Sequence, residues 1–195
     1  MHEAKQLFLE KGVKGTTVDE IIENSATGKG QFYYYFKNKE NLISEVIDHY
    51  GCEVLAAHLQ SLAQVKNIVH FMEWIQKAFD LAILKKERVG GCLLGVVMNE
   101  TTSEQKDKLR KQLINLLQEW RSLINERFDF FKEQGYLIQE TPNLELADFL
   151  ITIFEGAALF GKVYQNTHHL QVGLHHYCLY LASYISPKYR VNITV

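Results

Sequence analysis

The sequence predicts an all-α protein in two parts, and three observations support this fold class. Apolar residues recur at spacings of three and four along most of the 195 residues, which is the period of an amphipathic helix. Alternating apolar and polar residues bounded by turn residues, the mark of strands, are scarce. Prolines, which interrupt helices, occur only at Pro142 and Pro187. The length suits a small N-terminal domain and a larger body, and a hydrophobic content of 47% is ample for a core.

The first predicted helix runs up to Gly12. Leu7, Phe8 and Lys11 keep helical spacing along it. Met1 falls within this helix, so the sequence leaves open whether the helix is short or begins upstream.

The next two predicted helices are short and joined by a tight turn. Thr17 followed by Glu20 forms a capping box, in which a hydroxyl and a carboxylate each satisfy a free backbone donor at a helix start. The chain breaks at Ala26-Thr27-Gly28, and the segment from Phe32 to Phe36 then forms a helix of about two turns. Two short helices across such a turn form a helix-turn-helix, whose second helix has the size of a DNA major groove.

Positive charge is concentrated near this second helix but not across the N-terminal domain. No acidic residue lies between Glu23 and Glu40, whereas Lys29, Lys37 and Lys39 lie at the two ends of the helix, where phosphates flank a groove. Residues 1–50 hold six lysines, no arginine and eight acidic residues, a net charge of 6 − 8 = −2. Three lysines alone would equally suit a solvated helix end. Their combination with the helix-turn-helix favours DNA binding.

The segment SATGKGQFYYYFKNKENL, residues 25–42, resembles the DNA-binding domain of TetR-family transcriptional regulators. Three positions depart from the family's usual pattern: Ala26 replaces the turn glycine, Gly28 replaces the capping serine, and Tyr35 replaces a histidine. The resemblance implies a helix-turn-helix domain over residues 1–44. It also implies a set of DNA-contacting residues, namely Thr17, Thr27, Gly28, Lys29, Gly30, Gln31, Tyr33, Tyr34, Tyr35 and Lys39.

Within this set, Gln31 is the candidate for reading sequence. It lies in the first turn of the recognition helix, and its amide can pair bidentately with adenine. Phe32 and Phe36, four residues apart on one face, should instead pack inside the domain. The alternative for Gln31 is an exposed helix residue without a role in recognition.

Residues 45–195 predict a helical body, which brings the expected total to about nine helices. One helix, capped by Asn38, extends into the body through His58. The others are expected over about 68–83, 92–99 and 109–135, and over about 167–185. Between the last two, Thr141 should cap a helix that has Pro142 in its first turn and runs through Gly161. Gly90-Gly91 and the segment 101–104 separate the middle helices.

The segments GGCLLG and FEGAALFGK resemble the ligand-binding bodies of the same family. Aromatic side chains could line a pocket for an apolar or planar small molecule, with His58, Asn99 and Gln118 to orient it. The alternative is that the aromatic residues simply fill the core. The aromatic candidates are Phe71, Trp74, Phe79, Trp120, Phe128 and Phe154.

Cys92 precedes an apolar helix, whose dipole would lower the pKa of the thiol and make it a candidate sensor of electrophiles or oxidants. The alternative is a small residue that fills space. The chain's three cysteines are expected to be reduced thiols rather than disulfide partners.

Gly156, Ala157, Ala158 and Gly161 place small side chains along one helix. Two half-sites on DNA are usually read by a dimer, and the resemblance puts this helix and the last one at a homodimer interface. Tight packing inside one subunit is the alternative.

No phosphate-binding glycine loop, nucleophile elbow, HExxH motif or paired CxxC motif occurs, so we expect no enzyme, no cofactor and no metal site. Neither a run of about 18 apolar residues nor a signal-peptide pattern occurs, which predicts a cytoplasmic protein without a membrane partner. We expect a homodimeric repressor that a small-molecule inducer releases from double-stranded operator DNA. The alternative is a helical regulatory adaptor that has lost DNA binding. The sequence leaves open the inducer, the target genes, and repression against activation.

Overall fold

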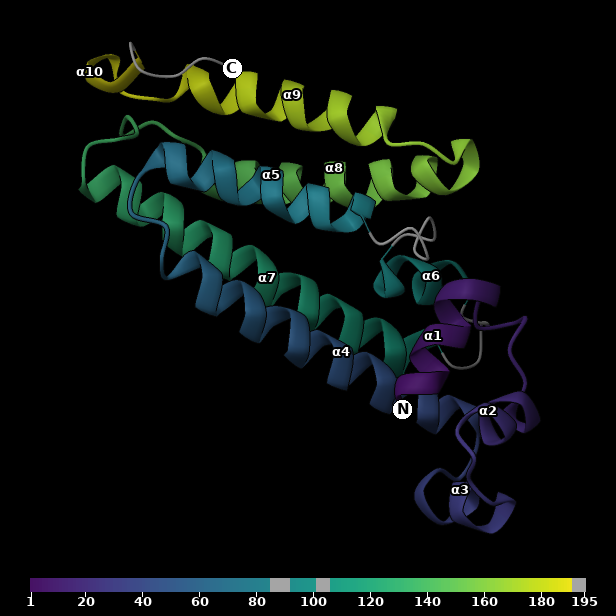
Figure 1. Cartoon of the computed structure of the whole chain (residues 1–195). Coiled ribbons are helices and arrows are strands. Elements are labelled where there is room, and N and C mark those ends of the chain that lie inside the picture. The colour runs from purple at the N-terminus through teal and green to yellow at the C-terminus, as the bar shows by residue number, and fades with distance from the viewer. Residues whose placement is uncertain (85–91, 101–105, 191–195) are drawn as a thin grey trace.

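A computed structural model describes the backbone of residues 1–84, 92–100 and 106–190 (Figure 1). The predicted breaks at Gly90-Gly91 and 101–104 lie outside these residues. The described part is helical throughout, apart from turns and one isolated bridge between Leu137 and Ile185. Its helices are α1 (His2–Lys11), α2 (Val18–Asn24), α3 (Lys29–Tyr35), α4 (Lys39–Leu62), α5 (Ile68–Leu84), α6 (Leu93–Glu100), α7 (Lys106–Glu133), α8 (Asn143–Tyr164), α9 (His168–Ser183) and α10 (Pro187–Arg190).

The all-α prediction is confirmed, with ten helices in the described ranges where about nine were expected. The short α10 was not expected. Two local details also differ. Helix α8 begins at Asn143, so Pro142 lies just before its first turn. Thr141 does not cap α8, because its hydroxyl donates to the Ile138 carbonyl at 2.6 Å and closes the preceding turn instead.

The body is built from long helices that lie side by side. Helices α4 and α7 pack along each other, as do α8 and α9, and α5 lies against α9 (Figure 1). Their inward faces form one buried cluster that includes Phe71, Phe128 and Phe131 at its centre. Tyr177 is fully buried in the same cluster, where its hydroxyl donates to the Leu146 carbonyl at 3.2 Å.

The N-terminal helices share a second buried cluster with part of the body. Phe8 of α1, Phe32 of α3 and Ile47 of α4 lie in it. Four apolar residues of α6 and two of α7 complete it: Leu93, Leu94, Val96, Val97, Leu109 and Leu113. The core under the helix-turn-helix therefore contains helices from both parts of the chain.

The turn between α2 and α3 has a specific backbone geometry. The Thr27 amide donates to the Ile22 carbonyl and the Ala26 amide donates to the Glu23 carbonyl, both at 3.2 Å. These two bonds are those of a Schellman motif, which places one residue after the helix end in the left-handed region. That residue is Ala26, with φ of 51°. Glycine is the usual residue there, since a Cβ costs about 1–2 kcal/mol in this conformation.

We therefore predict that Ala26→Gly stabilises the folded protein. Relief of the left-handed strain exceeds the added chain entropy of glycine, for a net gain of about 0.5–1 kcal/mol. Urea unfolding at fixed protein concentration would measure it. The matched control is Ala57→Gly in the middle of α4, where the same change should cost about 1 kcal/mol. Destabilisation by both variants would contradict the assignment.

Candidate functional site

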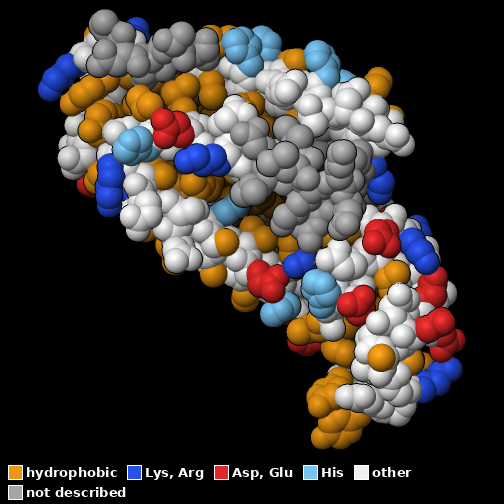
Figure 2. All heavy atoms as spheres, viewed as in Figure 1, with side chains coloured by type: hydrophobic (Ala, Val, Ile, Leu, Met, Phe, Trp, Pro, Cys, Tyr) orange, Lys and Arg blue, Asp and Glu red, His pale blue; other side chains and the backbone are white. Residues whose placement is uncertain are grey.

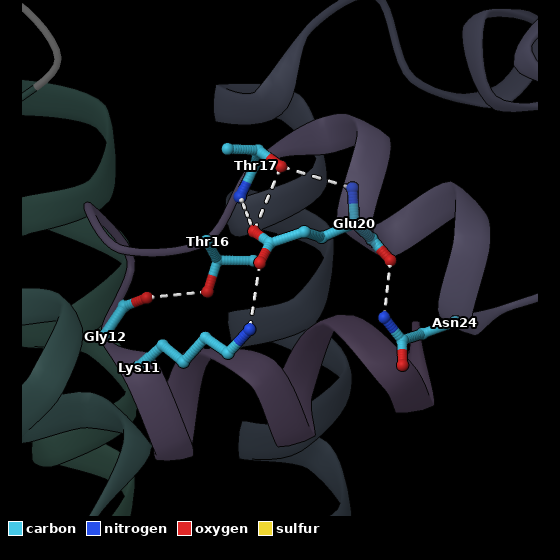
Figure 3. A network of polar contacts seen from close by, with 6 residues as sticks. All are labelled: Lys11, Gly12, Thr16, Thr17, Glu20 and Asn24. Atoms are coloured by element: carbon cyan, nitrogen blue, oxygen red, sulfur yellow. Dashed lines mark hydrogen bonds and ion pairs between the residues drawn. The ribbon is translucent and has the colours of Figure 1, made fainter.

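A polar network holds α2 against α1 (Figure 3). The Glu20 carboxylate accepts from the Thr17 amide at 2.8 Å and from the Lys11 ammonium at 2.9 Å. The Thr17 hydroxyl in turn accepts from the Glu20 amide at 3.2 Å, which completes the predicted capping box. The hydrogen bond from Lys11, followed by those from Thr17, lowers the pKa of Glu20 to about 2. The first helix of the motif is thereby fixed in direction.

Helix α3 presents most of its surface to solvent. Phe32 is buried, and its ring packs 5.4 Å from that of Phe36, as predicted. Tyr33, Tyr34 and Tyr35 are exposed, Tyr34 by 82%. Figure 2 shows this hydrophobic patch at the end of the molecule where Figure 1 places α3. Aromatic side chains on a projecting helix cost solvation unless they meet a partner, so the patch is a candidate contact surface.

The backbone at the start of α3 is also open. Gly28 is the N-cap residue, and its extended backbone carries no side chain to cap the helix. A Cβ added at Gly28 or at Gly30 would meet nothing within 4 Å. Packing within the chain therefore does not require either glycine. Bare backbone amides at a helix start suit the close approach of a phosphate. Gln31, in the same turn, is exposed.

The two lysines of the predicted DNA-contacting set differ in their surroundings. The Lys29 ammonium lies 3.0 Å from the Asp19 carboxylate, and both side chains are largely exposed. Such a pair is weak, so Lys29 stays accessible to an anion. Lys39 is placed differently from the expectation, because its ammonium donates to the Val13 carbonyl inside the domain. Partial burial lowers the pKa of Lys39.

Seven of the nine predicted ligand-binding residues meet in one aromatic cluster of the body. The His58 ring lies 5.3 Å from the rings of both Trp74 and Trp120. Trp120 contacts Phe154 at 5.8 Å, and Phe154 contacts Phe79 at 5.3 Å. Phe71 joins the cluster to Phe128 at 5.1 Å and to Trp74 at 5.8 Å. Helices α4, α5, α7 and α8 each contribute at least one ring.

The aromatic cluster holds polar atoms that have no hydrogen-bond partner among the residues that the structure describes. They are His58 Nδ1 and Trp120 Nε1, both buried. Burial also lowers the pKa of His58, so the imidazole is neutral near pH 7. A buried polar atom without a partner costs about 1–3 kcal/mol. A ligand or ordered water would recover this cost.

The other two predicted ligand-binding residues lie elsewhere. Asn99 is exposed on α6, where its amide donates to the Gly95 carbonyl at 2.9 Å. Cys92 lies between the Tyr50 hydroxyl, 3.9 Å from its sulfur, and the Glu155 carboxyl. Burial and the Glu155 carboxyl raise the pKa of Cys92. The expected lowering of its pKa by the helix dipole is therefore outweighed, and the thiol is a poor nucleophile here.

Gln118 lines a separate open groove of about 520 Å³ between α4 and α7, with Leu55 and Leu59. None of the residues that line this groove belongs to the aromatic cluster. Among the described residues, no group of three or more His, Cys, Asp or Glu side chains is arranged to hold a metal ion. Within the same ranges, no helix is both long and apolar enough to cross a membrane.

Two family models match the chain. Residues 1–46 match the family of bacterial regulatory proteins of the TetR type, and residues 64–174 match the C-terminal domain of LmrA/YxaF-like transcriptional regulators. An uncharacterized HTH-type transcriptional regulator of Lactococcus lactis is 31% identical over 86% of this chain and 83% of its own length. The chain belongs to the TetR family of transcriptional regulators. It is thus a DNA-binding regulator from a family that is not one of enzymes.

Other TetR-family proteins are similar over most of the chain. The HTH-type transcriptional repressor DhaR of Mycobacterium sp. (strain GP1) is 28% identical over 83% of this chain and 79% of its own. Among solved structures, reduced NemR of E. coli superposes with a TM-score of 0.80 at 18% identity, covering 95% of this chain and 94% of that one. A cysteine mutant of CifR with operator DNA gives 0.77 at 21% identity, covering 90% and 92%. At these identities the structures confirm the fold.

One residue that lies near the aromatic cluster of the body was not predicted from the sequence. Glu155 follows Phe154 on α8 and is mostly buried, and its Oε1 atom has no partner in the described ranges of the chain. Burial raises the pKa of Glu155, while the hydrogen bond with Cys92 lowers it. A signal was present, since Glu155 stands alone among apolar and small residues between Asp148 and Lys162.

The lowered pKa of Glu20 predicts that the N-terminal domain loses stability in acid. Its folded value of about 2 lies below 4.5, so its stabilising contribution is complete above pH 4.5 and is lost as the pH falls toward 2. Amide chemical shifts of residues 17–24, followed by NMR from pH 6 to pH 2, should show α2 loosening in this window. Glu20→Gln should flatten that dependence. Glu23→Gln removes the same charge outside the network and should keep it, so equal profiles for Glu20→Gln and wild type would contradict the role of Glu20.

Proposed function

We propose that this regulator is a cytoplasmic homodimeric repressor, released from its operator when a small molecule binds the aromatic cluster. The observation that carries the proposal is α3, a recognition helix that exposes Gln31, three tyrosines and the uncovered backbone of Gly28 and Gly30. The similar protein DhaR is named a repressor, and the CifR structure contains operator DNA.

The proposed division of work on DNA follows exposure. Hydroxyls of Thr17, Thr27, Tyr33, Tyr34 and Tyr35 and the ammonium of Lys29 contact phosphates, with the backbone of Gly28 and Gly30 close to the sugar-phosphate chain. Gln31 reads a base edge. Lys39, whose ammonium is bonded to Val13, is given a different role below.

The homodimer is proposed to form through α8 and α9. Phe160, Val163 and Tyr164 of α8 and Leu179 of α9 are exposed although they are large and apolar. A Cβ at Gly156 would meet nothing within 4 Å, so its own subunit does not fill that space. Apolar faces on two adjacent helices suit a four-helix interface between two copies.

The proposed switch uses α4 as the connection between ligand and DNA. This helix of 24 residues begins at Lys39 beside the recognition helix and carries His58 into the aromatic cluster. A planar molecule that inserts beside His58 and Trp120, and pairs with their free polar atoms, would displace α4 and change the distance between the two α3 helices. Coupling of about 1–3 kcal/mol is typical of such switches, and it is reciprocal.

The experiment starts from an operator selected by the wild-type dimer from a pool of random duplexes. Fluorescence anisotropy then measures operator affinity with and without each member of a library of planar aromatic compounds. We expect at least one compound to weaken binding, and Trp120→Ala to abolish that response while operator affinity is kept. Sound operator binding with no responsive compound would contradict the inducer mechanism. Failure to select any duplex would instead favour the adaptor that has lost DNA binding.

Gln31→Ala tests sequence reading directly. Because a bidentate amide–adenine pair discriminates by about 1–3 kcal/mol, the variant should lose that much affinity for the selected operator. The loss should disappear on operators changed at one base pair per half-site, and affinity for random DNA should be almost unchanged. Testing operators altered one pair at a time locates the contact. A uniform loss on every operator would remove Gln31 from base recognition.

A further inference from the structure

One peptide group in the turn between α1 and α2 is bonded on both sides by charged side chains. The carbonyl of Val13 accepts from the Lys39 ammonium, and the amide of Lys14, in the same peptide group, donates to the Glu100 carboxylate at 2.8 Å. Lys39 is the first residue of α4, and Glu100 is the last residue of α6. We call this arrangement the 13–14 clamp.

The turn around the 13–14 clamp is closely packed. Gly12 has φ of 78°, and a Cβ there would stand only 2.3 Å from Glu100 Oε1, so the carboxylate occupies the space of a side chain. Thr16 is fully buried, and its hydroxyl donates to the Gly12 carbonyl at 2.8 Å. The positive φ favours glycine at position 12, and a side chain there would also have to displace the Glu100 carboxylate from its present position.

The charges of the clamp act together. A cation at the carbonyl and an anion at the amide both stabilise the dipole of the peptide group between them, and such charge-assisted bonds are stronger than neutral ones. Desolvation lowers the pKa of Lys39, and the charges of Glu40, Glu100 and Glu20 oppose that change. The ammonium is thus held within the protein by acidic neighbours.

We propose that Lys39 and Glu100 are positioning residues, which fix the recognition helix relative to the body through the 13–14 peptide. The turn from Gly12 to Thr16 leads directly into Thr17, the N-cap of α2, and α2 carries α3. Helix α6 belongs to the body in sequence but shares its buried apolar residues with α1. Lys39 therefore neutralises the dipole of an internal peptide and no DNA phosphate. The consequence for operator binding rests on the proposed function; the clamp itself does not.

The clamp is tested first in the free dimer, by hydrogen exchange of the Lys14 amide measured by NMR. Glu100→Ala removes the acceptor and should speed exchange about tenfold, as a lost charged hydrogen bond predicts. Glu100→Gln keeps an acceptor oxygen and should restore most of the protection. The matched control is Lys5→Met with Glu53→Ala, which removes a second Lys–Glu pair between α1 and α4, 2.9 Å apart, and should leave Lys14 unchanged. Unaltered exchange in Glu100→Ala would overturn the clamp.

Operator affinity at several salt concentrations tests the positioning role. Lys39→Met should weaken operator binding about tenfold while the slope of log affinity against log salt stays as in wild type, since no phosphate contact is lost. Lys29→Met, the matched phosphate-contact variant, should flatten that slope by about one unit. Lys39→Met combined with Glu100→Ala should bind no more weakly than the weaker single variant, because both act through one peptide.

The outcomes separate the two proposals. A slope flattened by Lys39→Met to the same extent as by Lys29→Met would overturn the positioning role and make Lys39 a phosphate contact. Additive losses in the double variant would also overturn it. If wild type selects no operator, the proposed function fails, whereas the exchange experiment still decides whether the clamp exists.

Discussion

The packing of Phe32 beneath α3 is the interaction on which the DNA-reading surface depends. A helix of seven residues is unstable alone in water, since nucleation costs more than its few hydrogen bonds return. Phe32 is the one residue of α3 that is buried, and its neighbours Tyr33, Tyr34 and Tyr35 are exposed. Three features hold the surface on which Phe32 packs: the capping box of α2, the left-handed turn at Ala26 and the apolar face of α6. The exposed helix α3 is therefore stabilised by the packing of Phe32 and by the turn that precedes it.

The charge distribution of the N-terminal domain favours DNA recognition that depends little on lysine side chains. Residues 1–50 contain six lysines and no arginine, and most of these lysines have partners within the chain. Lys5 is bonded to Glu53 and Lys11 to Glu20. Lys39 is bonded to Val13, and Lys29 lies next to Asp19. In the proposed complex Lys29 exchanges Asp19 for a phosphate, whereas Lys5, Lys11 and Lys39 keep their partners. Few counterions are then released on binding, so we expect affinity to depend weakly on salt. In the proposed complex, hydroxyls, backbone amides and the Gln31 amide supply a larger share of the affinity than they would in a basic DNA-binding domain.

The sequence predicted best what short-range patterns determine. The Thr17–Glu20 capping box and the Asn38 cap, which accepts from the Asn41 amide at 2.8 Å, each depend on residues three positions apart. Most of the aromatic cluster was also predictable in composition, because helical spacing places Phe71, Phe79, Trp120, Phe128 and Phe154 among the apolar residues of their helices. The surroundings of Lys39 and Cys92 were not predictable in this way, because their partners lie far away in sequence: Val13 for the lysine and Glu155 for the cysteine. Burial is the main cause of the pKa shift of each group.

The domain boundary expected after residue 44 divides the sequence, but the packing crosses that boundary at α6. Its four buried residues complete the core of α1, and its last residue holds the turn that follows α1. Its first turn lies against α8, since a Cβ at Gly95 would stand 3.0 Å from Glu155 Oε2. Helix α6 thus contacts both the N-terminal domain and α8, which carries part of the proposed dimer interface.

The unpaired buried atoms of the body lower the stability of the free protein and offer partners to a ligand. His58 Nδ1, Trp120 Nε1 and Glu155 Oε1 each lack a partner within the described part of the chain, and each such atom costs free energy in the unliganded state. A ligand that pairs with them recovers that cost, and this gain is available only in a conformation whose cluster has opened. Binding energy is then coupled to a change of shape by the same atoms that make the empty body less stable. In the proposed switch this change reaches the N-terminal domain along α4, because that one helix carries Lys39 at its start and His58 near its end.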